Sequence, residues 1–144
     1  MSDFPSEPFF IRNIYSGKVL DVANSGSEGS EIVLAYRKGS DHDGQLWTYG
    51  DGFFVNKHSG LVLEVPGYEG GGTITPGSVL RQSTKREKPD SLNQLWAYNY
   101  QLLCPYDPKV AITGEDADSE AGTRAVVDTV EHHDPKFQWM FDTV

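Results

Sequence analysis

The chain has one cysteine, Cys104, among its 144 residues, so no disulfide bond can form within it. A small domain without disulfides is typical of a reducing compartment or of a fold that needs no cross-links. The start of the sequence also lacks a basic segment followed by an apolar run, which is the pattern of a secretory signal. We therefore expect a cytoplasmic protein, and we expect Cys104 to be a small buried side chain and not a reactive thiol.

Long apolar runs and positive charge are scarce as well. No stretch approaches the roughly 18 apolar residues that are needed to cross a membrane. The 12 basic and 21 acidic residues give a formal net charge of −9. Such a surface repels phosphate backbones and anionic membranes, which argues against nucleic acid as a partner and against membrane insertion. The clustered cations of residues 85–88 are interpreted as a solvated loop.

Helical periodicity is missing too, since no window of a dozen residues sustains it. Short segments rich in β-branched and aromatic residues alternate instead with clusters of Gly, Pro, Ser, Asn and Asp. Strands are expected near residues 9–14, 18–22, 31–36, 45–49, 52–56, 61–65, 78–82, 94–98, 101–104, 109–113, 124–129 and 139–142. The sequence thus predicts an all-β chain.

These segments repeat. The sequence FIRNIYSGKVLDV of residues 10–22 aligns with FFVNKHSGLVLEV of residues 53–65, and in each a Ser-Gly pair separates two strands. Gln-Leu-Trp-x-Tyr occurs at residues 45–49 and again at 94–98, and a third tryptophan follows at Trp139. Glycine supplies the positive φ of a hairpin turn. The chain is therefore predicted to contain three similar units, the third of which is the most divergent.

A unit of about 45 residues exposes an apolar face that it cannot close on itself, whereas three units can bury theirs around a common axis. Trp47, Trp96 and Trp139 recur once in each unit, so they are predicted to lie in this shared core. Gln45 and Gln94 point to the other side of their strands, where their amides can hold the backbone of a turn.

Three units, each with a V-L-D-V-like strand, a G-x-x-V strand and a closing Q-x-W, resemble the ricin-B-type (QxW) β-trefoil lectins over residues 9–141. In character the chain is most similar to the cytoplasmic fungal members. The resemblance implies a β-trefoil with pseudo-threefold symmetry in a single domain, residues 1–144, with repeats at 9–49, 52–98 and 100–142. It also implies non-catalytic binding of glycans, most simply of terminal galactose or N-acetylgalactosamine.

The resemblance further implies a sugar site in the first repeat, formed by Asp21, Asn24, Tyr36, Asp43 and Gln45. A carboxylate such as Asp21 accepts charge-assisted hydrogen bonds from two neighbouring hydroxyls, and an aromatic ring such as Tyr36 packs flat against a sugar ring. The asparagine that the family has before the closing glutamine is Gly44 here. Asp43 and Asp41 are the two candidates to replace its contact.

The other two repeats keep less of this pattern. A possible second carbohydrate site comprises Glu64, Tyr68, Asn93 and Gln94. Gln82 is assigned to the stacking position of this repeat, with Tyr68, on the loop of residues 66–77, as a possible replacement ring. In the third repeat the acid, the ring and the glutamine are assigned to Ile112, Thr129 and Phe137. That third pocket is expected to be inactive.

Other constellations carry less weight. His132 and His133 are adjacent, and neighbouring side chains of an extended chain point apart, so the two cannot easily share one ion. The acidic segment 114–122 lacks the central glycine of a calcium loop. Asp21 and Glu64 belong to different repeats and not to one cleft, as paired catalytic acids would. We expect no metal, no cofactor and no enzymatic activity.

A shallow sugar pocket binds weakly, on the order of millimolar or about −4 kcal/mol. Useful strength then requires several pockets, which predicts a homodimer. Two other functions stay open from the sequence. One is a β-trefoil protease inhibitor that acts through exposed loops such as residues 66–77, and the other is a scaffold that binds a protein such as actin. Retention on immobilised galactose separates the lectin from both.

Overall fold

The computed structural model describes residues 4–23 and 26–144, which form thirteen β-strands and several short 3-10 turns. The first repeat contains β1 (Phe9–Asn13), β2 (Val19–Val22), β3 (Ile32–Ala35) and β4 (Trp47–Gly50). The second contains β5 (Phe53–Asn56), β6 (Val62–Glu64), β7 (Ser78–Val79), β8 (Arg81–Ser83) and β9 (Ala97–Asn99). The third contains β10 (Leu102–Cys104), β11 (Val110–Gly114), β12 (Ala125–Thr129) and β13 (Trp139–Thr143). The predicted all-β class is confirmed.

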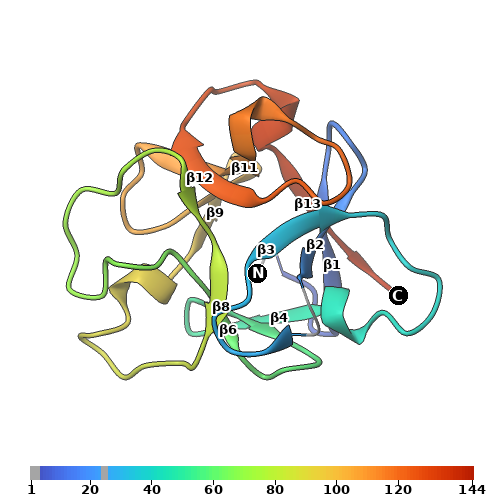
Figure 1. Cartoon of the computed structure of the whole chain (residues 1–144), viewed down its shortest axis with the longest axis horizontal. Coiled ribbons are helices and arrows are strands. Elements are labelled where there is room, and N and C mark those ends of the chain that lie inside the picture. The colour runs from blue at the N-terminus through green and yellow to red at the C-terminus, as the bar shows by residue number, and fades with distance from the viewer. Residues whose placement is uncertain (1–3, 24–25) are drawn as a thin grey trace.

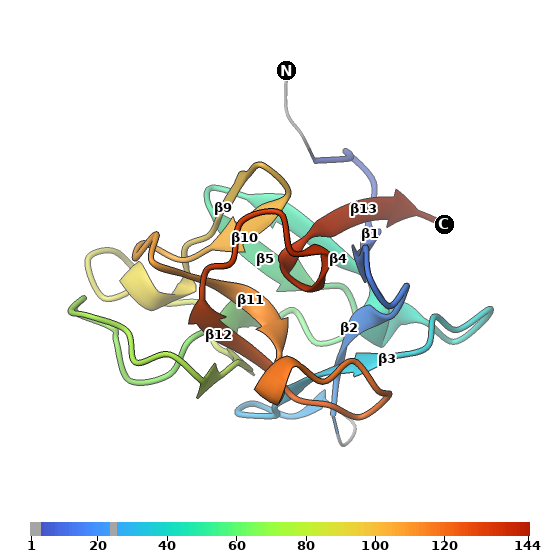
Figure 2. The same ribbon diagram turned by 90° about the horizontal axis from the view of Figure 1, so that it is seen from above.

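Figure 1 shows the three repeats as three lobes around a common centre, with the first in blue to cyan, the second in green to yellow and the third in orange to red. The barrel closes between the first and last strands, because β1 pairs with β13 in antiparallel register from Phe9 opposite Thr143 to Asn13 opposite Trp139. Figure 2 shows these two strands together at one side of the molecule, near the C-terminus. The pseudo-threefold arrangement is that of a β-trefoil.

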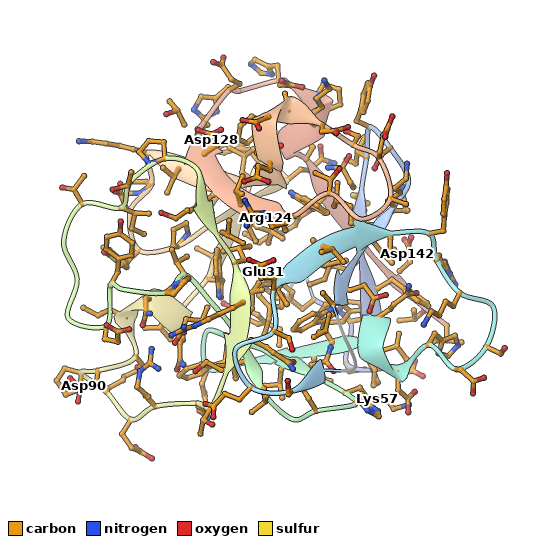
Figure 3. All side chains as sticks on the ribbon, viewed as in Figure 1. Glu31, Lys57, Asp90, Arg124, Asp128 and Asp142 are labelled. Carbon is orange, nitrogen blue, oxygen red and sulfur yellow. The ribbon has the colours of Figure 1, made fainter. Side chains whose placement is uncertain are left out.

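The third strands of the repeats meet around this centre. The Ile32 N–H donates to the Leu80 carbonyl (3.1 Å), and the Leu80 N–H donates to the Ala125 carbonyl (2.9 Å). The strand predicted at residues 78–82 is split at Leu80, since β7 pairs with β12 of the third repeat and β8 pairs with β6 of its own. Arg124 and Glu31 form an ion pair (3.2 Å), and Figure 3 shows both near the middle of the view.

The core contains the three repeated tryptophans, as predicted. Trp47 and Trp139 are fully buried and Trp96 nearly so. Each indole N–H donates to a main-chain carbonyl of the second strand in its own repeat: Trp47 to Leu20 (3.3 Å), Trp96 to Leu63 (3.0 Å) and Trp139 to Ile112 (3.0 Å). Satisfying the indole N–H in this way removes the penalty of burying it and fixes the orientation of the ring.

The two hairpins predicted from Ser-Gly pairs also occur, with φ values of 74° at Gly17 and 73° at Gly60. A side chain at either glycine would be strained in this left-handed region. Cys104 is buried, as expected, and its desolvation raises the pKa of the thiol above its ordinary value.

Strand pairing defines which residues occupy matching positions. Asp21 lies opposite Val33, and Glu64 lies opposite Arg81. Three residues beyond these partners stand Tyr36 in the first repeat and Thr84 in the second. The residue that matches Tyr36 is therefore Thr84, and the assignment of Gln82 to the stacking position was wrong.

Gln82 instead matches Leu34, whose side chain packs into the core. Its fully buried amide donates to the carbonyls of Gly26 (2.6 Å) and Ser27 (2.9 Å) and accepts from the Ser59 hydroxyl (2.8 Å). Gln82 thus joins the first two repeats and offers no face to a ligand.

The assignment of Ile112 to the acid position was also wrong, by one residue. Ile112 packs in the core and accepts the indole hydrogen bond of its repeat, as Leu20 does in the first repeat. The acid position is therefore occupied by Thr113, which pairs with Val126. A shift of one residue along a strand exchanges the two faces of the sheet. Thr129 and Phe137 match Tyr36 and Gln45, as the sequence indicated.

Candidate functional site

A hollow of about 370 Å³ lies in the first repeat, where β2 ends and the chain enters β4. It is lined by Asp21, Val22, Gly26, Lys38, Asp41, Asp43, Gly44, Asn56 and His58. Several of these come from the η2 turn (Asp43–Gln45) and the loop that precedes it. The hollow is open and mostly polar, and it includes two of the residues predicted to bind sugar, Asp21 and Asp43.

Asp21 is the most precisely held group of this hollow. Its Oδ1 accepts a hydrogen bond from the Val22 N–H (2.7 Å), and its Oδ2 accepts one from the Gln45 side-chain amide (3.2 Å). Among the described residues no ion pair involves Asp21. The carboxylate is thus oriented by neutral donors and keeps lone pairs for other hydroxyl or amide donors.

Gln45 supports this arrangement from below. It is 1% exposed, and besides Asp21 its amide donates to the Tyr36 carbonyl (2.9 Å) and accepts from the Lys38 N–H (3.0 Å). Gln94 makes the same bonds in the second repeat, to the Thr84 carbonyl and from the Arg86 N–H, both at 2.9 Å. The prediction that these amides hold turn backbone is confirmed.

Tyr36 does not line the hollow that Asp21 lines. Its side chain is 73% exposed, and the Lys18 ammonium lies 5.0 Å from the centre of its ring. The main-chain carbonyl of Tyr36 and the carboxylate of Asp21 share the Gln45 amide, so the two residues are neighbours. The hollow shared by both side chains, which the sequence predicted, is not formed in this conformation.

The remaining predicted residues are placed as follows. The Asp43 carboxylate forms an exposed ion pair with Lys57 (3.3 Å) at the edge of the hollow. Asn24 lies outside the described residues. The turn containing Gly44 is held by the Asn56 amide, which donates to the Gly44 carbonyl (2.9 Å).

Sequence reasoning missed Lys38, Asn56 and His58 in the lining. The alignment of residues 10–22 with 53–65 matches Asn56 to Asn13, but it gives no sign that Asn56 borders the hollow of the preceding repeat. That proximity arises from the antiparallel pairing of β4 with β5, in which Trp47 lies opposite Asn56.

The acid position of the second repeat is closed. Glu64 is 0% exposed, and its carboxylate pairs with Arg81 (Nε to Oε2, 2.5 Å) and with Arg86. The Gln94 amide donates to the same carboxylate (3.0 Å), and the Asn93 amide oxygen accepts from Arg86 (2.8 Å).

The structure thus brings Glu64, Asn93 and Gln94 together, as predicted, but around two guanidinium groups and not around an open pocket. Arg86 belongs to the cation cluster that the sequence assigned to a solvated loop. Arg86 precedes Gln94 by eight residues, and Lys38, which lines the first hollow, precedes Gln45 by seven. This similar spacing is the sequence signal that could have placed Arg86 at the second site.

Tyr68 is not part of this cluster. Its hydroxyl accepts from the Thr75 N–H (2.9 Å), its ring packs partly against the core, and the hydrogen bond lowers the pKa of its phenol. The Tyr68 hydroxyl is therefore bonded within its own loop, and the structure does not bring the ring to Glu64 as a replacement stacking group.

The third repeat has a hollow of about 240 Å³ in the matching position, lined in part by Thr113, Asp128, Thr129 and Phe137. The acid position is occupied by Thr113 and therefore carries a hydroxyl in place of a carboxylate. This hydroxyl donates to the Lys136 carbonyl (2.9 Å). Within residues 4–23 and 26–144, no group of three or more His, Cys, Asp or Glu side chains could hold a metal ion. In the same residues no helix is long and apolar enough to span a membrane.

The comparisons with known proteins agree with this architecture. Residues 7–139 match the family described as the Ricin-type beta-trefoil lectin domain, and the chain belongs to this family. It is 38% identical over 52 residues to Mucoricin of Rhizopus delemar (strain RA 99-880 / ATCC MYA-4621 / FGSC 9543 / NRRL 43880). That match spans about a third of each protein, 35% of this chain and 35% of Mucoricin.

Solved structures similar to the chain are β-trefoils as well. The mdaA-1 domain superimposes with a TM-score of 0.83 at 27% identity, over 98% of this chain and 92% of that domain. The C-half of the earthworm R-type lectin, solved in complex with GalNAc, gives 0.77 at 18% identity, over 96% and 99%. The designed threefold-symmetric protein ThreeFoil gives 0.78 at 24% identity, over 95% and 99%. Membership of the lectin family supports a carbohydrate-binding role for this chain.

Proposed function

We propose that the chain is a non-catalytic lectin that binds terminal galactose or N-acetylgalactosamine units through the hollow of the first repeat. The observation that carries this proposal is Asp21, a carboxylate that lines an open hollow, is held by two neutral hydrogen bonds and is paired with no described cation. A fixed, unpaired acceptor is the group that two neighbouring sugar hydroxyls require. The GalNAc complex of the earthworm lectin, a protein with the same fold, supports the choice of sugar.

In this proposal the residues in and around the hollow have separate roles. Asp21 accepts from two hydroxyls, and Gln45 keeps the carboxylate in place from beneath. Asp43 at the edge supplies further acceptors, in place of the family's asparagine. The exposed Tyr36 ring rotates over the hollow when sugar binds, since exposed side chains change rotamer within nanoseconds.

The strength of binding follows from the open geometry. A single wet pocket gives a dissociation constant on the order of 1 mM, so the proposal includes a homodimer that engages two glycans at once. Sedimentation of the purified chain measures whether it forms.

The proposal is tested on immobilised galactose. The wild-type chain should be retained and should elute with free galactose, and Asp21→Asn should lose at least about 10-fold in affinity, because a charge-assisted acceptor becomes neutral. Asp128→Asn is the matched control. Asp128 lines the third hollow and accepts from the N–H of its own next residue (2.8 Å), as Asp21 does, but it does not stand at the acid position. Equal retention of the wild type and Asp21→Asn would overturn the proposal.

A further inference from the structure

A separate hollow of about 260 Å³ lies beside the β9–β10 hairpin and is lined by Tyr100, Leu102, His132, His133 and Gln138. It shares no lining residue with the hollow of Asp21 or with the hollow of Thr113. None of the acid positions, Asp21, Glu64 and Thr113, lines it, so it is not part of the site described above.

The matching region of the first repeat is filled. Phe10 of the first strand is fully buried and packs with Leu46, the residue before the closing tryptophan. The Arg37 guanidinium covers the ring of Phe10, 4.2 Å from its centre. A large ring, a leucine and a cation thus occupy this region together.

The second repeat fills the same region with similar groups. Phe53 matches Phe10 and is 3% exposed. The Lys85 ammonium lies 4.5 Å from the centre of the Phe53 ring, and Leu95 precedes the closing tryptophan. The same three kinds of side chain thus occur twice.

The third repeat changes all three. Leu102 matches Phe53, because it lies opposite Asn99 as Phe53 lies opposite Gly50. Gln138 replaces the leucine before the tryptophan, and Val130 replaces the covering cation. Each replacement is smaller or more polar, and two of them, Leu102 and Gln138, line the hollow.

The turn of the β9–β10 hairpin, which borders this hollow, also differs from its counterpart between the first and second repeats. In the β4–β5 hairpin the two turn residues are Asp51 (φ 52°) and Gly52 (φ 91°), a favoured pair for left-handed backbone. The matching residues of the β9–β10 hairpin are Tyr100 (φ 53°) and Gln101 (φ 67°). Neither is suited to positive φ, so this pair disfavours the fold relative to Asp-Gly.

Tyr100 gains nothing in burial from this position, since it is 90% exposed. His133 in the facing loop also has a left-handed φ, of 70°. Residues with strained backbone that cluster on one hollow are typical of a binding site.

We propose that this hollow is a second saccharide-binding site, in which the Tyr100 ring packs against a sugar ring and His132, His133 and Gln138 bond its hydroxyls. The assignment rests on the proposed lectin function. Imidazole and amide groups both donate and accept, as hydroxyls do. Among the residues that the structure describes, no carboxylate, lysine or arginine lines the hollow, which favours a neutral ligand, and its volume suits a single ring.

Two sites on one chain have a consequence for cross-linking. In Figure 2 the β9–β10 hairpin and the β2–β3 pair lie on opposite sides of the barrel. Glycans bound at the two hollows therefore belong to different molecules or to distant branches, and a single chain can bridge them.

The test is an NMR titration of the full-length chain with galactose, N-acetylgalactosamine, glucose, N-acetylglucosamine and mannose, each to concentrations on the order of 10 mM or above. At least one sugar should shift the backbone amide signals of His132, His133 and Gln138 saturably. Asp21→Asn should keep these shifts. The double variant Tyr100→Asp/Gln101→Gly, which copies the β4–β5 turn, should weaken this binding at least about 10-fold while its melting temperature rises by about 2 to 5 °C.

Every outcome of these experiments either supports or overturns the inference. The inference is overturned if none of the five sugars shifts these signals, if Asp21→Asn removes the shifts, or if the turn variant binds as the wild type does. If the double variant does not fold, Tyr100→Ser provides the same comparison of affinity. If no sugar shifts the amide signals of Asp21 and Gln45 in the wild type while the signal of His132 does shift, the site of the proposed function is overturned and this one stands.

Discussion

The first and second repeats carry an acid at the same position of the same strand, yet only one of the two acids faces a hollow. Asp21 is held by a main-chain N–H and an amide, whereas Glu64 is sealed between Arg81 and Arg86. The residue opposite the acid is Val33 in the first repeat and Arg81 in the second. The neighbours of the acid, and not the acid itself, decide whether a repeat has an open site.

The largest expected effect is on stability and concerns the closed acid position of the second repeat, Glu64. Glu64→Gln replaces a fully buried carboxylate between two partly exposed guanidinium groups by a neutral amide, so the free energy of unfolding should fall by about 2 to 4 kcal/mol. Urea denaturation measures this change. Asp21→Asn is the control, and it should cost less than about 1 kcal/mol because no ion pair is broken. Equal losses for the two variants would show that the acids are not in different environments.

An effect of intermediate size is expected on sugar affinity at the open site of the first repeat. Gly44 has no left-handed φ, and a Cβ built there would lie 3.5 Å from the Asp21 Oδ1, which is ordinary contact. Gly44→Asn should therefore be tolerated and should add one hydrogen bond to the sugar. One such bond is worth about 1 kcal/mol, or roughly a 5-fold gain in galactose affinity.

Titration calorimetry with galactose measures this gain. Gly70→Asn, in a loop of the second repeat where a Cβ meets nothing within 4 Å, is the matched control and should change nothing. A weaker affinity for Gly44→Asn would mean that the new side chain fills the hollow instead of binding sugar.

The smallest effect is expected for the ion pair between Lys57 and Asp43, which is compared with the ion pairs of Glu64. Both side chains of the Lys57–Asp43 pair are about half exposed, whereas the carboxylate of Glu64 is fully buried. Lys57→Ala should change the free energy of unfolding by less than about 0.5 kcal/mol, because water screens an exposed pair. Thermal and urea denaturation both report it, and a loss above about 1.5 kcal/mol would contradict the contrast between the repeats.

Much of the fold could be predicted because its signals are local. Turn residues, alternation and the repeated Gln-Leu-Trp determine where strands begin and end, and Gln45 and Gln94 behave as their position in the repeat suggested. The two errors, at Gln82 and Ile112, concern register. Ile112 is one residue from the matching position and Gln82 is two residues from it. The repeats differ in length before these strands, so only the observed pairing places Thr84 and Thr113 at the matching positions.

The candidate site was only partly predictable, since its chemistry depends on contacts between distant residues. Asp21 and Gln45 do meet, as the repeat spacing indicated. The ring of Tyr36 lies outside their hollow, and the hollow includes His58 from the next repeat.

By itself the sequence determined an all-β chain of three similar units with a tryptophan core, because periodic burial and turn chemistry act over a few residues. Only the tertiary structure decided which acid stays open, since Arg86 reaches Glu64 across 22 residues of chain. It also decided where the third repeat leaves space beside Tyr100. Packing and charge pairing depend on which side chains meet in space, and no local pattern of residues records that.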